Sequence, residues 1–506
     1  MMLARLRPIV RRGLGHGLGR RHYATANNIF FQSQAYINGR WLESDSHQVF
    51  PVLNPATNEV IGEVADCDEQ DFIFAAQAAT KSFKSWSETT AKQRSHLLRQ
   101  MAAAQMANQK ELAEILTIES GKPMSEAMGE IAYGASFFEW YADIARSIKG
   151  ELISSPFPDK TLMYIRQPAG PVGIITPWNF PNAMITRKLA AALAAGCTAV
   201  IKPAPDTPYS ALAIAKLIDG MDIPEGVVNI VPSSVQNSPK VGMHMCKSPD
   251  LKVISFTGSS AVGKLLLQQS ASTVKRVCLE LGGNAPFIVF ESANLEKAVS
   301  GYIASKFRNN GQTCVCANRC LVQATVYDKF VELLKQKMQE KLKPGDVMSE
   351  KTTLGSLINA NAVKKVEAHV QNAIEGGAKL VVGGKSPKAN HFEPTLIVDA
   401  KHDMLCCQEE TFGPVAAIVK FSTEEEALEL ANSVRHGLAA YFYSQDLGQI
   451  NRVSKKLESG MVGVNEGVIS TCEVPFGGVK ESGLGREGGH LGLEEFQEVK
   501  YICLCT

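Results

Sequence analysis

Short apolar runs that alternate with helix-length segments constrain the fold of this chain more than any other feature. Such runs occupy residues 199–201, 227–231 and 253–256, and each gap between them is long enough for one helix. Strands connected through helices pair in parallel. The alternation restarts after Glu280 with a run at 287–290. The sequence therefore predicts an α/β protein with two doubly wound domains.

Length and the remaining apolar pattern agree with this division. The chain has 506 residues, of which 45% are hydrophobic, and this is longer than one domain usually is. Residues 67–148 are predicted to form long amphipathic helices, including one over Ala91 to Glu119. The longest apolar stretch, Leu189 to Ile201, is too short to cross a bilayer. It is predicted to be a buried helix followed by a strand, and no membrane contact is expected.

The N-terminus differs in composition from the rest of the chain. Residues 1–23 are rich in arginine, and the first acidic residue is Glu43. This composition is typical of a mitochondrial transit peptide, whose removal after Tyr23 would leave Ala24 as the new terminus of a soluble matrix protein. A disordered basic tail is the alternative. The formal net charge is +1 and no other basic block occurs, which argues against nucleic acid and favours a small-molecule partner.

The cysteines indicate neither a disulfide framework nor a metal site. Twelve of them are too sparse for a disulfide scaffold in a chain of this length, and a matrix protein would keep most of them reduced. The Cys314-Val315-Cys316 and Cys406-Cys407 segments lack the spacing of zinc ligands, and no histidine cluster accompanies them. Most of these thiols are expected to lie in the core, with no metal bound.

Two motifs carry chemistry. Glu280-Leu281-Gly282-Gly283 supplies a carboxylate, and Gly311-Gln312-Thr313-Cys314 supplies a thiol. A thiolate attacks a carbonyl carbon well, and a carboxylate in a dry pocket can activate the water that releases the bound product. Cysteine is also a common core residue, and a glutamate before two glycines can simply end a strand. Spacing alone leaves both interpretations open.

A glycine-containing loop follows the apolar run at 253–256. Gly258 to Lys264 matches a phosphate-binding P-loop as far as Leu265, where a Ser or Thr would be needed for Mg²⁺. The dinucleotide fingerprint G-x-G-x-x-G is absent too. What remains is a strand, a Gly-Ser turn and the N-terminus of a helix. The free N–H groups and the dipole at a helix N-terminus favour the binding of a pyrophosphate. An ordinary strand-to-helix turn is the alternative, and a P-loop phosphotransferase is disfavoured by Leu265.

Together these motifs resemble the NAD(P)-dependent aldehyde dehydrogenase family. The resemblance extends from about residue 36 to the C-terminus. It rests on seven segments, which in chain order are 177–181, 202–203, 256–259, 280–283, 307–314, 409–414 and 475–478. The resemblance implies two Rossmann-like domains and a β-arm for a homo-oligomer, either dimer or tetramer. The implied ranges are 24–149 with 171–280 for cofactor binding, 281–484 for catalysis, and 150–170 with 485–506 for the arm.

The family resemblance also implies the cofactor and its contacts. NAD or NADP would be bound by Thr176, Pro177, Trp178, Lys202, Gly258, Ser259, Gly263, Glu410 and Phe412. Pro205 stands where NAD-preferring members often have a glutamate that binds the ribose 2′-hydroxyl. The neighbouring Asp206 could still repel a 2′-phosphate, so the sequence leans to NAD without deciding the choice.

The implied reaction divides between three residues. Cys314 attacks the aldehyde, the Asn179 amide and the Cys314 backbone N–H stabilise the oxyanion, and Glu280 activates water to hydrolyse the thioester. Cys316 matches a second cysteine found in the succinate-semialdehyde-oxidising members, where it implies a redox switch through a Cys314–Cys316 disulfide. A bystander thiol is the alternative.

The same members of the family suggest the substrate. Arg187, Arg308 and Ser470 match residues that bind the substrate carboxylate, which implies oxidation of succinic semialdehyde to succinate in 4-aminobutyrate degradation. Glutarate semialdehyde should be only partly excluded. An aldehyde dehydrogenase of broad specificity and a non-enzymatic descendant remain as alternatives.

Overall fold

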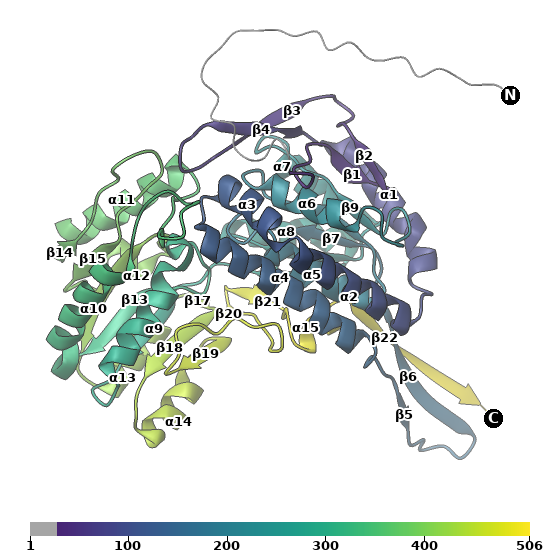
Figure 1. The fold of residues 1–506 in the computed structure, drawn as a ribbon. Helices are drawn as coiled ribbons and strands as arrows, with labels where there is room; N and C mark the ends of the chain where they lie inside the picture. Colours follow the sequence, from purple (N-terminus) through teal and green to yellow (C-terminus); the bar gives the residue numbers. More distant parts are fainter. Residues whose placement is uncertain (1–27, 506) are drawn as a thin grey trace, which may run out of the picture.

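Two mainly parallel sheets, each covered by helices, form the frame of the molecule (Figure 1). The structure is a computed structural model that describes residues 28–505. The predicted leader, residues 1–23, lies outside the described residues. Within the described part, every helix is too short or too polar to serve as a membrane span.

The first sheet has eight strands in the order β2-β1-β9-β8-β7-β10-β11-β21. Its central strands, from β9 to β11, pair in parallel, as the spacing of the apolar runs predicts. The strands are β1 (Ala35–Ile37), β2 (Arg40–Leu42), β7 (Val172–Ile175), β8 (Ala199–Lys202), β9 (Val228–Ile230), β10 (Val253–Thr257), β11 (Arg276–Glu280) and β21 (Gly483–Leu484). β21 pairs antiparallel with β11, so the C-terminal region returns to the first sheet beside Glu280.

The second sheet has seven strands in the order β14-β15-β16-β13-β12-β18-β19, and only β14 runs antiparallel to its neighbour. Its strands are β12 (Ala285–Val289), β13 (Ala317–Gln323), β14 (Lys379–Val382), β15 (Thr395–Val398), β16 (Val415–Phe421), β18 (Ala439–Tyr443) and β19 (Met461–Val464). Two further sheets have two strands each and are formed by β3 (Val49–Leu53) with β4 (Val60–Ala65) and by β17 (His436–Gly437) with β20 (Val479–Lys480).

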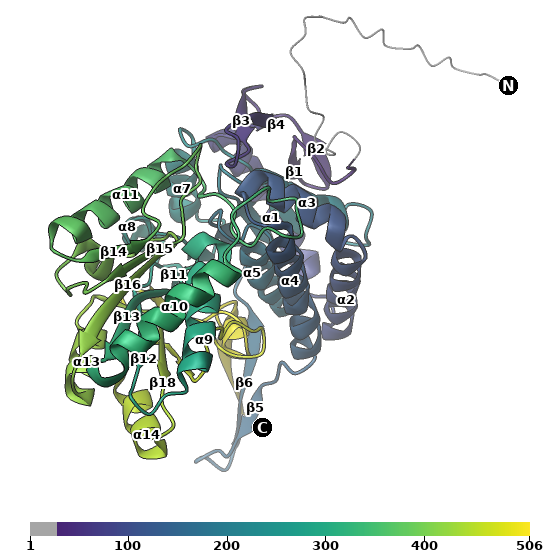
Figure 2. The same ribbon diagram turned by 60° about the vertical axis from the view of Figure 1, so that its left-hand side comes forward.

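Helices cover both sheets (Figure 2). Those before β12 are α1 (Glu69–Trp86), α2 (Ala91–Ala107), α3 (Gln109–Ser120), α4 (Met124–Ala145), α5 (Ala183–Ala195), α6 (Pro208–Ile218), α7 (Ser238–Lys247), α8 (Ser260–Ser270) and η2 (Ala271–Thr273). Those after it are α9 (Leu295–Phe307), η3 (Arg308–Gly311), η4 (Ala324–Val326), α10 (Tyr327–Lys341), α11 (Ala360–Glu375), α12 (Leu405–Gln408), α13 (Glu424–Asn432), α14 (Leu447–Lys456) and α15 (Leu491–Glu494).

The single helix predicted over Ala91 to Glu119 is divided at Asn108. The backbone there leaves the helical region, with φ −116° and ψ 26°, and the Asn108 side-chain amide donates to the Ala104 carbonyl. A short polar side chain that bonds nearby backbone competes with helix continuation. The apolar spacing persists across the break, and for this reason the sequence pattern does not reveal it.

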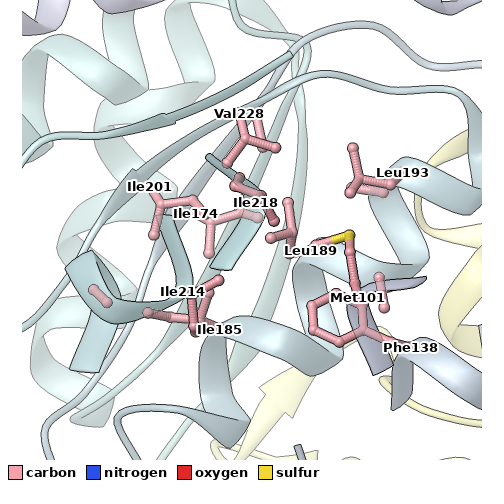
Figure 3. Packing of buried hydrophobic residues seen from close by; sticks show 14 of the residues in the cluster. Met101, Phe138, Ile174, Ile185, Leu189, Leu193, Ile201, Ile214, Ile218 and Val228 are labelled. Carbon is pink, nitrogen blue, oxygen red and sulfur yellow. The ribbon is translucent and has the colours of Figure 1, made fainter. Parts of the chain in front are cut away.

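Helix α5 is buried along its whole length. Its apolar side chains Ile185, Leu189 and Leu193 lie in the core, where the first sheet contributes Ile174 and Ile201 (Figure 3). Apart from Thr186, Arg187 and Lys188 the helix is apolar, and a helix with apolar side chains on most of its surface is stable only when other elements surround it. The predicted buried helix and strand over Leu189 to Ile201 are confirmed as the end of α5 and β8. This core fixes the N-terminal half of α5, which carries Arg187.

An antiparallel ribbon projects from the body (Figure 1). It comprises β5 (Glu151–Ile153), β6 (Lys160–Pro168) and β22 (Gln497–Cys505), and β22 pairs with β6 along its full length. Several apolar side chains on it face solvent, such as Leu152, which is 73% exposed, and Tyr501, which is 61% exposed. The two segments of the predicted arm thus meet in one sheet, although residues 485–496 precede the strand.

Candidate active site

The catalytic motifs lie where the two sheets meet. Glu280 ends β11 of the first sheet, and Cys314 lies between η3 and β13 of the second. The segment between β11 and β12 passes close to the cysteine loop, because a Cβ at Gly283 would come within 2.4 Å of the Cys314 carbonyl oxygen. Only glycine at position 283 permits this approach. The chain therefore brings the two motifs together although they belong to different sheets.

The loop before Cys314 has an unusual backbone. Asn309, Asn310 and Gly311 all have positive φ, at 50°, 55° and 74°. Asparagine and glycine tolerate this region best. Side-chain bonds hold the loop: the Asn310 amide donates to the Gly355 carbonyl at 2.6 Å, and the Gln312 amide donates to the Ser356 carbonyl at 3.2 Å. The Asn-Asn-Gly-Gln sequence thus fixes the position of Cys314.

Asn179 lies in the same region. Its side-chain amide donates to the Gln312 carbonyl at 3.0 Å, and its side-chain oxygen is buried without a hydrogen-bond partner in residues 28–505. Its backbone oxygen accepts from the Lys122 ammonium at 2.8 Å and from the Asn309 amide at 3.0 Å. The turn that carries Asn179 is therefore tied directly to the cysteine loop.

Sequence reasoning missed the buried ion pair below this turn. Lys122 and Glu130 contact each other with both side chains about 1% exposed. The other Glu130 oxygen accepts the backbone N–H groups of Asn182 and Ala183, at 2.9 and 3.2 Å, where α5 begins. Because both residues are common surface types, nothing in the sequence pattern distinguishes them. Their contacts place the Asn179 turn relative to α5.

A cavity of about 380 Å³ opens next to Cys314 and Asn179. The predicted cofactor-binding residues that line it are Pro177, Trp178, Gly258, Ser259, Glu410 and Phe412. Ser259 caps the N-terminus of α8, and the buried Thr257 hydroxyl has no partner among the described residues. A helix N-terminus with unused donors suits a pyrophosphate. The cavity thus combines a helix N-terminus suited to a pyrophosphate with Cys314 in one lining, as a dinucleotide cofactor of this cysteine would require.

Three other predicted cofactor residues lie outside this lining. Thr176 follows β7, and its buried hydroxyl has no partner in residues 28–505. Lys202 ends β8, and its ammonium donates to the Pro203 carbonyl at 3.2 Å. Gly263 lies in α8, where a Cβ would meet the Leu281 side chain at 2.3 Å, so its place in the structure is a packing contact.

A further cavity of about 540 Å³ lies beyond Lys202. Pro205, Asp206 and Glu119 are among its lining residues, and no lysine or arginine is present in the lining found within residues 28–505. Burial raises the pKa of Asp206, and bonds from Asn359 and the charge of Lys202 oppose this rise. Burial also lowers the pKa of Lys202 to about 8. This end of the site is acidic or neutral apart from Lys202.

Burial disfavours the charged form of both Cys314 and Glu280. Burial, with the nearby Glu410 carboxylate, raises the pKa of Cys314 to about 12. Burial, with the nearby Glu487 carboxylate, raises the pKa of Glu280 well above its usual range, and neither Glu280 oxygen has a hydrogen-bond partner in the described chain. Burial raises the pKa of Glu410 to about 7. Proton movement must therefore accompany the reaction.

Arg187 lies in α5 and is 2% exposed. Its Nε forms an ion pair with Glu487 at 2.6 Å, and its guanidinium lies 4.2 Å from the centre of the Phe476 ring. Glu487 also contacts Lys188, whose ammonium donates to the Ser255 hydroxyl at 3.2 Å. The Arg187 Nη2 atom has no partner among residues 28–505. Glu487 lies in a glycine-rich segment, and no periodicity in the sequence indicates its importance.

Arg308 and Ser470 meet in a narrow pocket, which we call the carboxylate pocket. Thr313 and Tyr441 also line it. Arg308 lies 5.0 Å from the centre of the Phe180 ring, and its guanidinium has no ion pair or hydrogen bond within the described residues. An unpaired guanidinium in the loop that leads to Cys314 is available to a ligand carboxylate.

Cys316 is buried beside the reactive cysteine. Its thiol donates to the Gly311 carbonyl at 3.3 Å, and the Lys306 ammonium is 3.9 Å from its sulfur. Burial raises the pKa of this thiol, and Lys306 opposes the rise. Cys314 and Cys316 are both free thiols in this structure.

A model of the aldehyde dehydrogenase family matches residues 41–502. The chain belongs to the aldehyde dehydrogenase family. It is 52% identical over 493 residues to the mitochondrial succinate-semialdehyde dehydrogenase of Rattus norvegicus, with 96% of this chain and 94% of that protein covered. It is 50% identical over 474 residues to a glutarate-semialdehyde dehydrogenase of Pseudomonas putida, with 94% and 98% covered.

Solved structures agree with this membership. The succinate-semialdehyde dehydrogenase from Burkholderia pseudomallei superposes with a TM-score of 0.94 at 47% identity, covering 96% of this chain and 100% of that one. A betaine aldehyde dehydrogenase from Staphylococcus aureus in complex with NAD+ superposes with a TM-score of 0.92 at 34% identity, covering 96% and 97%. The protein is thus an NAD(P)-dependent aldehyde oxidoreductase, as the motifs predict.

Proposed function

We propose that this enzyme oxidises succinic semialdehyde to succinate. The observation that carries the proposal is the unpaired guanidinium of Arg308, which lines the carboxylate pocket beside Ser470 and close to the cysteine loop. Arg187 lies in α5, and its Nη2 atom has no hydrogen-bond partner within residues 28–505, so it is available to the same substrate carboxylate. The relatives that bear the name succinate-semialdehyde dehydrogenase support the same assignment.

The two arginines give an estimate of selectivity. A charge-assisted hydrogen bond contributes about 1.5–3 kcal/mol, so two of them favour an aldehyde with a distal carboxylate by roughly 10² to 10⁴ over a neutral aldehyde. One additional methylene changes binding by only about 1–3 kcal/mol. Glutarate semialdehyde is therefore the second candidate substrate, supported by the similarity to the P. putida enzyme of that name.

In the proposed mechanism, the Glu280 carboxylate takes the proton of the Cys314 thiol, and the sulfur attacks the aldehyde carbon. The Asn179 amide and the Cys314 backbone N–H donate to the oxygen that becomes negative. One such donor contributes about 3–4 kcal/mol. A bound nicotinamide would supply the hydride acceptor. After Glu280 has released that proton to solvent, its carboxylate removes a proton from water, the resulting hydroxide attacks the thioester carbon, and the C–S bond breaks to release the acid and the Cys314 thiolate.

For the cofactor, we propose NAD in preference to NADP. A 2′-phosphate placed near Pro205 and Asp206 would meet the carboxylate of Asp206, and the cavity lining found within residues 28–505 contains no lysine or arginine to bind it. Pro205 cannot bind the ribose 2′-hydroxyl, so the preference should be moderate. An Asp206→Asn variant should lower the ratio of kcat/KM with NAD to kcat/KM with NADP. An unchanged ratio would remove Asp206 from the explanation.

The domain boundaries, the roles of the site residues and the oligomer belong to the same proposal. We assign residues 24–149 and 171–280 to cofactor binding, 281–484 to catalysis, and 150–170 with 485–506 to oligomerisation, in agreement with the exposed apolar side chains of the ribbon. Targeting to the mitochondrial matrix is proposed from the arginine-rich leader and the mitochondrial relatives.

We also propose that Cys316 forms a reversible disulfide with Cys314. In the redox step, two thiols lose two electrons and two protons to an oxidant such as hydrogen peroxide, which is reduced to water. A reduced Cys316→Ala variant should be active, and peroxide should inactivate it without recovery in dithiothreitol. Full recovery of the variant in dithiothreitol would show that Cys316 is a bystander.

The experiment that tests the proposed function is a comparison of initial rates of NADH or NADPH formation. The reduced, leader-free enzyme is given succinic semialdehyde, glutarate semialdehyde or butanal with each cofactor. A preference of at least about 10² for succinic semialdehyde over butanal is expected from the contacts of the two arginines. Equal kcat/KM values for these two substrates would contradict the proposal and leave an aldehyde dehydrogenase of broad specificity.

A further inference from the structure

A large cavity adjoins the carboxylate pocket. Its volume is about 550 Å³, and α9 and α10 form much of its wall. Arg308, Ala304 and Val468 line both this cavity and the carboxylate pocket. The two spaces therefore share one wall, and the Arg308 guanidinium belongs to both.

Three of the four charged side chains that line this cavity are positive. Besides Arg308, Lys337 and Lys341 of α10 line it, and Glu126 is the one carboxylate in the lining found within residues 28–505. Glu126 is already engaged, because it accepts the Asn309 backbone N–H at 2.8 Å. We call this space the lysine vestibule.

The two lysines are poorly neutralised. Lys337 has only a long ion pair of 3.8 Å to Glu340, and its side chain is 32% exposed. The Lys341 ammonium has no ion pair or hydrogen bond in the part of the chain that the structure describes. Apolar side chains, including Ile303, Phe307 and Leu342, form the rest of the wall. A cleft that combines one sign of charge with apolar walls concentrates ions of the opposite charge.

We propose that the lysine vestibule captures carboxylate-bearing aldehydes and delivers them to Arg308. This inference rests on the proposed function and extends it to the entry route of the substrate. The lysines act at a distance, on the charge of the incoming carboxylate, and the covalent steps at Cys314 do not require them. Their loss should therefore raise KM for a charged substrate and leave kcat unchanged.

The test is a double variant, Lys337→Gln with Lys341→Gln, assayed with succinic semialdehyde and with butanal at low and high ionic strength. At low salt, kcat/KM for succinic semialdehyde should fall about fivefold, because each charge at roughly 8 Å in water changes the rate about twofold. The difference in kcat/KM between the wild type and the variant should vanish near 1 M salt, because the Debye length there is only about 3 Å. Butanal kinetics should be unchanged.

Two controls separate charge from structure. Lys335→Gln removes a lysine from the same helix at a similar exposure of 39%, outside the vestibule, and should have no effect. Replacing Lys337 and Lys341 with arginine keeps both charges and should restore kcat/KM.

Three results would overturn the proposal. These are an unchanged KM for succinic semialdehyde in the double glutamine variant, a loss equal for both aldehydes, and a loss that persists at high salt. The substrate preference of the wild-type enzyme distinguishes a failure of the vestibule proposal from a failure of the proposed function. If the wild type prefers succinic semialdehyde and the variant retains the same KM, only the vestibule is wrong. If the wild type shows no preference, the proposed substrate is wrong and the vestibule with it.

Discussion

Arg187 and Arg308 were predicted to have the same role, but their surroundings differ. Arg187 is fully buried in α5, paired with Glu487 and packed against Phe476. Arg308 lies at the start of η3, partly exposed, and no carboxylate within the described residues pairs with it. A buried guanidinium without a counter-ion is costly, whereas a partly exposed one can stay unpaired until a ligand arrives. We infer from this contrast that Arg187, besides contacting the substrate, organises charge around Glu280, whereas Arg308 acts on the substrate alone.

The strongest test of this contrast is protein stability. In a Glu487→Gln variant, Arg187 and Lys188 remain buried without their carboxylate, and the free energy of unfolding should fall by about 3–5 kcal/mol. In an Arg308→Ala variant it should change by no more than about 0.5 kcal/mol, because no ion pair is lost. Urea unfolding of both variants measures the difference. Equal losses would show that Arg308 is as structural as Arg187.

The pH dependence of kcat gives the second test. Glu280 must be ionised to accept a proton from water, so kcat should rise with pH through the raised pKa of Glu280. The Glu487 carboxylate raises the pKa of Glu280, whereas Arg187 and Lys188 lower it. Glu487→Gln should therefore move the rising limb of the pH profile of kcat to lower pH. A shift of the limb by one pH unit corresponds to a change of about 1.4 kcal/mol in the free energy of ionisation of Glu280. A limb that stays in place would mean that Glu487 does not influence Glu280, and rate measurements from pH 5 to 10 decide this.

The smallest effect is expected at Ser470. Ser470 lines the carboxylate pocket with Arg308, and its single uncharged donor is expected to contribute about 1.5 kcal/mol or less, the low end for a hydrogen bond to a carboxylate. Ser470→Ala should therefore lower kcat/KM for succinic semialdehyde by roughly twofold to tenfold, with butanal as the control substrate. A loss as large as that of Arg308→Ala would mean that the serine orients the arginine as well as the substrate.

The sequence predicts the frame of this molecule well. The apolar runs fall on β8, β9 and β10, and the alternation with helices correctly indicates parallel sheets. It does so because strand spacing and helix length are local properties of the chain. The break at Asn108 was not predictable from the same pattern, since one side-chain bond decides it and the apolar positions continue through it.

The site was predictable only in part. The motifs identify Cys314, Glu280 and Asn179, and the structure brings the segments that carry them together. Glu487 could not be found by spacing, because it is distant in sequence from Arg187 and Lys188 and only the folded chain places the three together. The same holds for the ion pair of Lys122 and Glu130 below Asn179.

The most direct test of the account is the substrate preference of an Arg308→Ala variant. The ratio of kcat/KM for succinic semialdehyde to kcat/KM for butanal is measured for the wild type and the variant. We expect the ratio to fall by about 10- to 100-fold, the effect of one charge-assisted contact, with butanal turnover unchanged. An unchanged ratio, or an equal loss on both aldehydes, would contradict the claim that the unpaired arginine selects a carboxylate.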